Sequence, residues 1–138
     1  MHKEMLPIFS RRKFLFFSLL GVSFTAAAKR IIMPSEKKAF IHHVYFWLKR
    51  AGNQEDQLKL IEGLRKLARV KTIQSFHIGI PAATHRDVVD RSYGVSWCVF
   101  FRTPEDQEYY QVDPIHLQFV ESCSHLWERV VVYDSIDV

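Results

Sequence analysis

The chain is poor in cysteine and has little excess charge outside its N-terminus. Its 138 residues include only two cysteines, Cys98 and Cys123, which excludes a disulfide-rich scaffold. The two could form one bridge in an oxidising compartment, or each could be a small buried apolar residue. Of the formal net charge of +4, three charges fall within the first 28 residues. The remaining +1 supplies no basic face, so we expect no nucleic-acid partner.

The chain also lacks an apolar run long enough to cross a bilayer. Its longest, residues 14–28, spans about 15 residues, whereas a membrane-spanning helix needs about 20. The run follows Ser10-Arg11-Arg12-Lys13-Phe14-Leu15, which resembles the twin-arginine export motif, and it ends in Ala26-Ala27-Ala28. This layout predicts a twin-arginine-like signal peptide over 1–28 and a linker over 29–38. We therefore expect a periplasmic or otherwise exported protein. In the alternative, the segment stays uncleaved as the only contact with the membrane.

Alternation of side chains with period two predicts strands in the rest of the chain. The expected strands are residues 40–48, 71–80, 93–101 and 130–133. Both faces of the first are apolar or aromatic, which is typical of a central strand covered on both sides. In the third strand the larger residues share one face, while Gly94, Ser96 and Cys98 on the other face leave room for a helix or a ligand.

Two stretches between the strands have helical signals. Asn53 can cap a helix whose first turn contains Asp56. The expected apolar stripe of this helix comprises Leu58, Ile61, Leu64 and Leu67, with Ala68 beside them. Thr103-Pro104 starts a second helix, and Pro114 interrupts it after Val112. Residues 81–90 show no periodicity, which predicts a loop.

The resulting order, βαββαβ, is the ferredoxin-like arrangement. It predicts one α+β domain over residues 39–138, with an antiparallel four-stranded sheet whose helices cover one face. The other face would display large aromatic side chains, and an apolar patch of that size usually finds a partner. We therefore expect a homodimer in which two sheets pack face to face as a dimeric α+β barrel.

Three segments carry a resemblance to a known family. They are His43-Val44-Tyr45-Phe46-Trp47-Leu48-Lys49, Phe76-His77-Ile78-Gly79 and Asp113-Pro114-Ile115-His116-Leu117-Gln118-Phe119. In these motifs and in element order, the mature chain resembles the stress-responsive A/B barrel (Dabb) family of dimeric α+β barrels. The best understood enzymes of that family are similar to plant polyketide cyclases, which use a histidine and a tyrosine. The resemblance implies His116, in the Pro-x-His motif, and Tyr110, six residues before it.

The two residues suit aldol chemistry. A neutral histidine can remove a proton next to a carbonyl, and a phenol can donate to the developing oxygen anion. Alternatively, His116 could stabilise the kink between the two helical segments through a hydrogen bond to a backbone group near Pro114. Tyr110 could then be a packing residue without a role in chemistry. Because they lie on either side of Pro114, spacing alone does not tell whether they converge.

Further candidates are His43, His77 and Trp97, which we expect to contact a ligand in the cavity. His43, His77 and His116 together would form a set of three imidazoles of the kind that zinc accepts. Their spacing matches no metal motif, and we predict neither a metal nor a cofactor. The charged residues Arg86, Asp87, Asp90 and Arg91 form either a solvated surface or the rim of the cavity mouth.

Three functions follow as hypotheses. The first is a homodimeric barrel that binds a small apolar or aromatic molecule. The second is a polyketide-cyclase-like lyase that uses the His116–Tyr110 pair. The third is a non-catalytic stress or assembly protein. Polyketide chemistry uses activated acyl thioesters, which are not expected outside the cytoplasm, so the export signal weighs against the cyclase.

Overall fold

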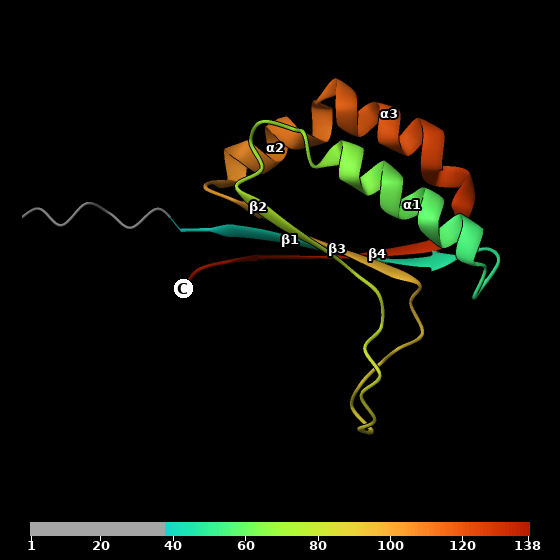
Figure 1. Cartoon of the computed structure of the whole chain (residues 1–138). Helices are drawn as coiled ribbons and strands as arrows, with labels where there is room; N and C mark the ends of the chain where they lie inside the picture. The colour runs from blue at the N-terminus through green and yellow to red at the C-terminus, as the bar shows by residue number, and fades with distance from the viewer. Residues whose placement is uncertain (1–37) are drawn as a thin grey trace, which may run out of the picture. The chain divides into compact units, whose positions relative to one another are not determined.

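The computed structural model describes residues 38–138, which form a four-stranded antiparallel sheet with its helices on one face (Figure 1). The elements are β1 (Phe40–Leu48), α1 (Gln54–Leu67), β2 (Ser75–Gly79), β3 (Val95–Phe101), α2 (Pro104–Val112), α3 (Pro114–Cys123), the 3₁₀ turn η1 (Ser124–Leu126) and β4 (Trp127–Ile136). The strand order β2-β3-β1-β4 confirms the ferredoxin-like fold. The predicted signal peptide and residues 29–37 of the linker lie outside the described residues.

The register of the strands assigns each side chain to one face of the sheet. His43 lies opposite Cys98 and Tyr133, and Val44 lies opposite Trp97 and Val132. Directly opposite residues share a face, so the set with Val44 faces the helices, and the set with His43 forms what we call the open face. Within this single chain β1 is therefore covered on one side only, in contrast to the expected cover on both.

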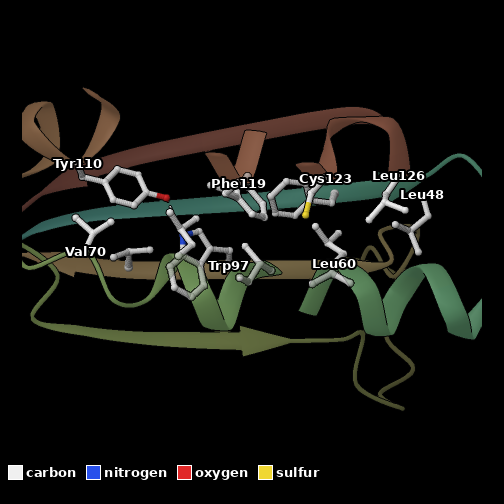
Figure 2. Packing of buried hydrophobic residues seen from close by; sticks show 14 of the residues in the cluster. Leu48, Leu60, Val70, Trp97, Tyr110, Phe119, Cys123 and Leu126 are labelled. Atoms are coloured by element: carbon white, nitrogen blue, oxygen red, sulfur yellow. Dashed lines mark hydrogen bonds between the residues drawn. The ribbon is translucent and has the colours of Figure 1, made fainter. Parts of the chain in front are cut away.

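The face of β3 that carries the large residues packs against the helices. Val95, Trp97, Val99 and Phe101 are all buried, and the smaller side chains of this strand lie on the open face. The space expected beside those smaller residues is consequently not filled by a helix. Figure 2 shows Trp97 within the core, near Tyr110 and Phe119.

Helix α1 begins as expected, because the Asn53 side chain accepts a hydrogen bond of 2.9 Å from the backbone nitrogen of Asp56. Its buried stripe is different from the expected one. Leu60 is fully buried and packs with Leu64 and Leu67, whereas Leu58 is 64% exposed. A repeat of three residues drifts around a helix of 3.6 residues per turn, so the spacing of four from Leu60 to Leu64 defines the stripe.

The predicted interruption of the helix at Pro114 is confirmed. Asp113 separates α2 from α3 and caps α3, since its Oδ1 accepts a hydrogen bond of 2.8 Å from the Ile115 backbone nitrogen. Thr103 caps α2 in the same way, through the Asp106 nitrogen at 3.2 Å. Proline at the first position of each helix needs no hydrogen-bond donor there.

The possible disulfide does not form, and both cysteines are free. Cys98 lies on the open face opposite His43, while Cys123 belongs to α3 and is buried among the core residues (Figure 2). The two thiols are thus on opposite sides of the sheet.

Three strands differ in length from the prediction, and of these β3 begins at Val95 instead of Tyr93. β2 is shorter because residues 70–73 form a turn, in which the Ile73 nitrogen donates to the Val70 carbonyl at 3.2 Å. β4 is longer because its pairing with β1 continues past the β-branched run to Ile136. The loop over residues 80–94 projects from the sheet on the side away from the helices (Figure 1). Among residues 38–138, no helix is long and apolar enough to cross a membrane.

Candidate functional site

The first candidate site, which we call the inner cavity, lies between the helix-covered face of the sheet and helices α2 and α3. It has a volume of about 160 Å³. Three half-exposed valines, Val120, Val130 and Val132, belong to its lining, and its polar groups come from His42, Gln111, Tyr110 and His116. The cavity is therefore mainly apolar, with a few polar groups that could orient a ligand.

Tyr110 projects from α2 into this region and is 1% exposed. Its hydroxyl oxygen accepts a hydrogen bond of 3.2 Å from Nε1 of Trp97 (Figure 2). Burial raises the pKa of the Tyr110 phenol well above its usual value, against the opposing effect of the Trp97 hydrogen bond. The phenol therefore stays protonated at neutral pH and keeps its own hydrogen available as a donor.

His116 lies at the start of α3, with its ring centroid 4.7 Å from that of Tyr110. Its Nδ1 is buried and has no hydrogen-bond partner among the described residues. Burial lowers the pKa of His116. The Gln111 backbone raises that pKa by a smaller amount, so the pKa stays below its usual value. The imidazole is therefore neutral at pH 7, the form that accepts a proton. The two residues named by the family resemblance do converge.

His42 is a site residue that the sequence analysis did not select. Its Nδ1 lies 2.7 Å from Oδ1 of Asp134, and its ring centroid lies 5.8 Å from that of Tyr110. Asp134 is directly opposite His42 in the pairing of β1 with β4. Asp134 lies just after residues 130–133, the β-branched run from which the fourth strand is predicted. The sequence analysis therefore does not pair Asp134 with His42.

The second candidate site, which we call the outer pocket, lies on the open face. It has a volume of about 380 Å³ and is lined by His43, Tyr45, Trp47, Asp90, Tyr93 and Tyr133. Burial and the nearby His77 lower the pKa of His43. Of the charged loop residues, Asp90 lies in this lining, while Arg86 and Asp87 are exposed and outside it.

The predicted ligand contacts are divided between the two sites. His43 lines the outer pocket, and Trp97 lines the inner cavity. His77 shares the open face with His43, because both lie opposite Cys98, but it lines neither site. The three-imidazole set is likewise split, since His116 lies on the other side of the sheet. Within residues 38–138 no three histidine, cysteine or acidic side chains are grouped so that they could hold a metal ion.

The four-stranded antiparallel sheet with its helices on one face defines an α+β protein of the ferredoxin-like class. The family model for the Stress responsive A/B Barrel Domain (Dabb) matches residues 41–137. The chain belongs to this family. No curated protein matches it in sequence.

Solved structures share the fold at low sequence identity. A Dabb family protein with a ferredoxin-like fold from Mesorhizobium loti is 17% identical, with a TM-score of 0.61, over 73% of this chain and 98% of its own. A dimeric ferredoxin-like protein from Thermobifida fusca is 14% identical, with a TM-score of 0.60, over 72% and 92%. The hydroxynitrile lyase from Passiflora edulis is 18% identical, with a TM-score of 0.61, over 74% and 95%. At these identities the comparisons establish the fold alone.

Proposed function

We propose that this protein is an exported, homodimeric member of the Dabb family that binds a small, uncharged apolar or aromatic molecule in its inner cavity. One observation carries the proposal: His116, whose buried Nδ1 has no hydrogen-bond partner among the described residues, belongs to the lining of a mainly apolar cavity. A buried polar atom without a partner is costly. A ligand with an apolar body and one hydrogen-bonding group would match this mainly apolar lining and its few polar groups.

The ligand is tested first by native mass spectrometry of the protein purified from its own host, and then by titration with acetophenone as a probe. Val132→Phe places a larger side chain in the cavity lining and should abolish binding. Ile136→Phe is the matched control, because Ile136 belongs to the same strand and is similarly exposed but does not line the cavity. Equal binding by both variants would contradict the proposed location.

The proposed dimer uses the open face. Ile41, His43, Tyr45 and Trp47 of β1 remain half-exposed there, and the Thermobifida fusca neighbour is described as dimeric. Packing of two such faces would remove this aromatic surface from water. Light scattering on the mature protein should give twice the monomer mass, and a monomer at all concentrations would contradict the dimer.

Export is supported by the twin arginines and the apolar run that follows them. Cell fractionation of the full chain should find the domain outside the cytoplasm. The double variant Arg11→Lys/Arg12→Lys keeps the charge but removes the motif, and it should be retained inside. Wild-type protein found only in the cytoplasm would overturn this part of the proposal and would also remove the argument against a polyketide substrate.

A second candidate function is proton transfer on a carbonyl compound, as in a lyase or cyclase. It is favoured by the contact of Tyr110 with His116, whose opposite pKa shifts leave a protonated donor beside a neutral base. The Passiflora edulis neighbour is a hydroxynitrile lyase, so a lyase is among the proteins that share this fold. The 18% identity between the two chains shows a shared fold and does not show that this chain has the same activity.

The two functions are separated by an exchange experiment. In deuterated buffer, a base at His116 would replace the methyl protons of acetophenone with deuterium faster than buffer alone, as followed by proton NMR. His116→Gln should abolish the exchange, and Tyr110→Phe should slow it by about 10²-fold or more. Binding without exchange would leave the binding function alone, and neither binding nor exchange would favour a non-catalytic assembly protein.

A further inference from the structure

The loop over residues 80–94 is long and extends away from the rest of its own chain. It projects from the sheet on the side of the open face (Figure 1). Its middle is a tight turn, in which the Val89 nitrogen donates to the Arg86 carbonyl at 2.9 Å. Val88, within this turn, is 88% exposed. We call residues 80–94 the arm and the turn from Arg86 to Val89 its tip.

The arm is held at its base by contacts with β1. Nε1 of Trp47 donates to the Ser92 hydroxyl at 2.9 Å, and the Gly94 nitrogen donates to the Phe46 carbonyl at 2.8 Å. Within the arm, Asp90 accepts a hydrogen bond of 2.7 Å from the Ser92 nitrogen. The direction of the arm is therefore fixed before any partner binds, which reduces the ordering cost of a contact made by the tip.

A second exposed apolar surface lies beside the inner cavity. Val120 of α3 and Val130 and Val132 of β4 belong to the cavity lining, yet their exposed fractions are 40%, 37% and 46%. β4 is an edge strand, so no further strand lies beyond it within the described chain. We call these three valines the mouth of the inner cavity. Adjoining apolar side chains left in water favour contact with a partner.

The arm and the mouth lie at the same level along the strands. Val95, which follows the arm, and Val130 are both directly opposite Phe46, one on each side of β1. The arm leaves the sheet from β2 and β3, whereas the mouth lies at the β4 edge. A two-fold axis that runs along the strands, between two open faces, exchanges these sides and keeps the level. It brings the arm of one copy to the β4 edge of the other.

The arm is long enough to pass that edge. Packed sheets are about 10 Å apart, whereas the chain from Val88 to Gly94, about six residues, spans up to about 20 Å when extended. The tip can therefore reach past the sheet of a second copy to the level of its helices. We infer that, in the dimer, each tip packs on the mouth valines of the partner subunit and closes its inner cavity. The inference rests on the proposed dimer and ligand site.

This contact would link the two parts of the proposed function. It removes Val88 and the mouth valines from water, which is favourable, and it occurs twice in a symmetric dimer. It also completes the lining of each cavity with a segment of the second copy. Because a ligand held under the tip is enclosed only in the dimer, ligand binding and dimer formation would strengthen each other.

Cysteine cross-linking tests where the tip lies. In a background of Cys98→Ala and Cys123→Ala, the pair Val88→Cys and Val130→Cys should give a covalent dimer on a non-reducing gel after oxidation with diamide. Within one chain the tip and Val130 are on opposite sides of the sheet, so this disulfide forms only between copies. The control pair is Val88→Cys with Arg102→Cys, an exposed position at the other end of β3. A dimer that cross-links through Arg102, or through neither position, would overturn the inference.

A charge at the tip tests the strength of the contact. Val88→Asp should raise the dissociation constant of the dimer by about tenfold for each arm, and therefore by about 100-fold in total. Val138→Asp makes the same substitution at an exposed valine outside the arm and should leave the constant unchanged. Sedimentation velocity over a dilution series measures the constants, and thermal melts establish that the variants are folded. Equal constants for wild type and Val88→Asp would contradict the inference.

Acetophenone titration separates this inference from the proposed function. Val88→Asp should bind acetophenone about tenfold more weakly than wild type, although Val88 does not line the cavity of its own chain. Undiminished binding by Val88→Asp would overturn the closure of the cavity and leave the binding function intact. A wild type that dimerises and cross-links through Val130 but does not bind acetophenone would uphold the arm contact and contradict the ligand site. A monomeric wild type would overturn both proposals.

Discussion

The ring centroids of Tyr110 and His116 lie 4.7 Å apart because the helix is interrupted at Pro114 between them. A continuous helix would place residues six apart on different faces. Asp113 instead adopts an extended conformation and starts a new helix, which turns His116 back toward Tyr110. Burial then shifts the pKa values of the two side chains in opposite directions. The break in the helix is thus what creates a donor and an acceptor that face one cavity.

The hydrogen bond between Trp97 and Tyr110 should contribute measurably to stability. Tyr110→Phe leaves the buried indole nitrogen–hydrogen of Trp97 without its acceptor, so the free energy of unfolding should fall by about 1–3 kcal/mol. In a Trp97→Phe background the same substitution should cost less, because the donor is already gone. Urea denaturation of the four proteins measures this coupling. Equal costs in both backgrounds would show that the bond adds nothing to stability.

Stability should decrease on mild acidification. His43 and His116 both have pKa values below their ordinary value of 6.5, so between that value and their folded pKa values the unfolded chain binds more protons than the folded one. The free energy of unfolding therefore rises with pH in this window and falls as pH drops below about 6.5. Denaturation midpoints from pH 8 to pH 5 measure the slope.

The matched variants for this pH dependence are His116→Gln, which should flatten the slope, and His85→Gln in the exposed loop, which serves as the control for removing a histidine. A wild-type slope in His116→Gln would mean that the loss of stability comes from other groups.

Much of the fold could be predicted from local patterns. The alternation in β1, the Asn53 and Thr103 caps and the break at Pro114 each depend on residues close together in the chain, and all are present. The predicted buried stripe of α1 is wrong at Leu58. Several spacings of apolar residues are compatible with one helix, and the contact with the sheet decides which of them is buried.

The sites were harder to predict because they depend on register between strands. Alternation within a strand separates its two faces, but it does not tell which face meets the helices. His43 and Trp97 were therefore placed together, although the pairing of β1 with β3 puts them on opposite sides of the sheet. The contact of His42 with Asp134 joins residues 92 positions apart, and only the register of β4 brings them together.

Two leucines of α1 should respond very differently to truncation. Leu60 is fully buried in the core, so Leu60→Ala should lower the free energy of unfolding by about 2–5 kcal/mol. Leu58 is 64% exposed, and Leu58→Ala should change it by about 0.5 kcal/mol or less. Chemical denaturation of the two variants compares the same substitution on one helix. Similar losses would mean that the helix is rotated relative to the sheet.

The spacing of α1 and α3 should depend on Gly63. A Cβ at this position would lie 2.6 Å from Sγ of Cys123 and 3.3 Å from the Phe119 ring, both of which belong to α3. Although alanine is the better helix former by about 1 kcal/mol, Gly63→Ala should be destabilising, because overpacking in a core costs about 1–3 kcal/mol.

Removing the thiol separates this steric cost from helix propensity. In a Cys123→Ala background, Gly63→Ala meets less of α3, so its cost should shrink or change sign, giving a favourable coupling of about 1 kcal/mol in a double-mutant cycle. Since α3 also carries His116, the clash should displace the lining of the inner cavity, and acetophenone binding should weaken in Gly63→Ala and recover in the double variant. Destabilisation that is identical in both backgrounds would place the strain elsewhere than at the contact with Cys123.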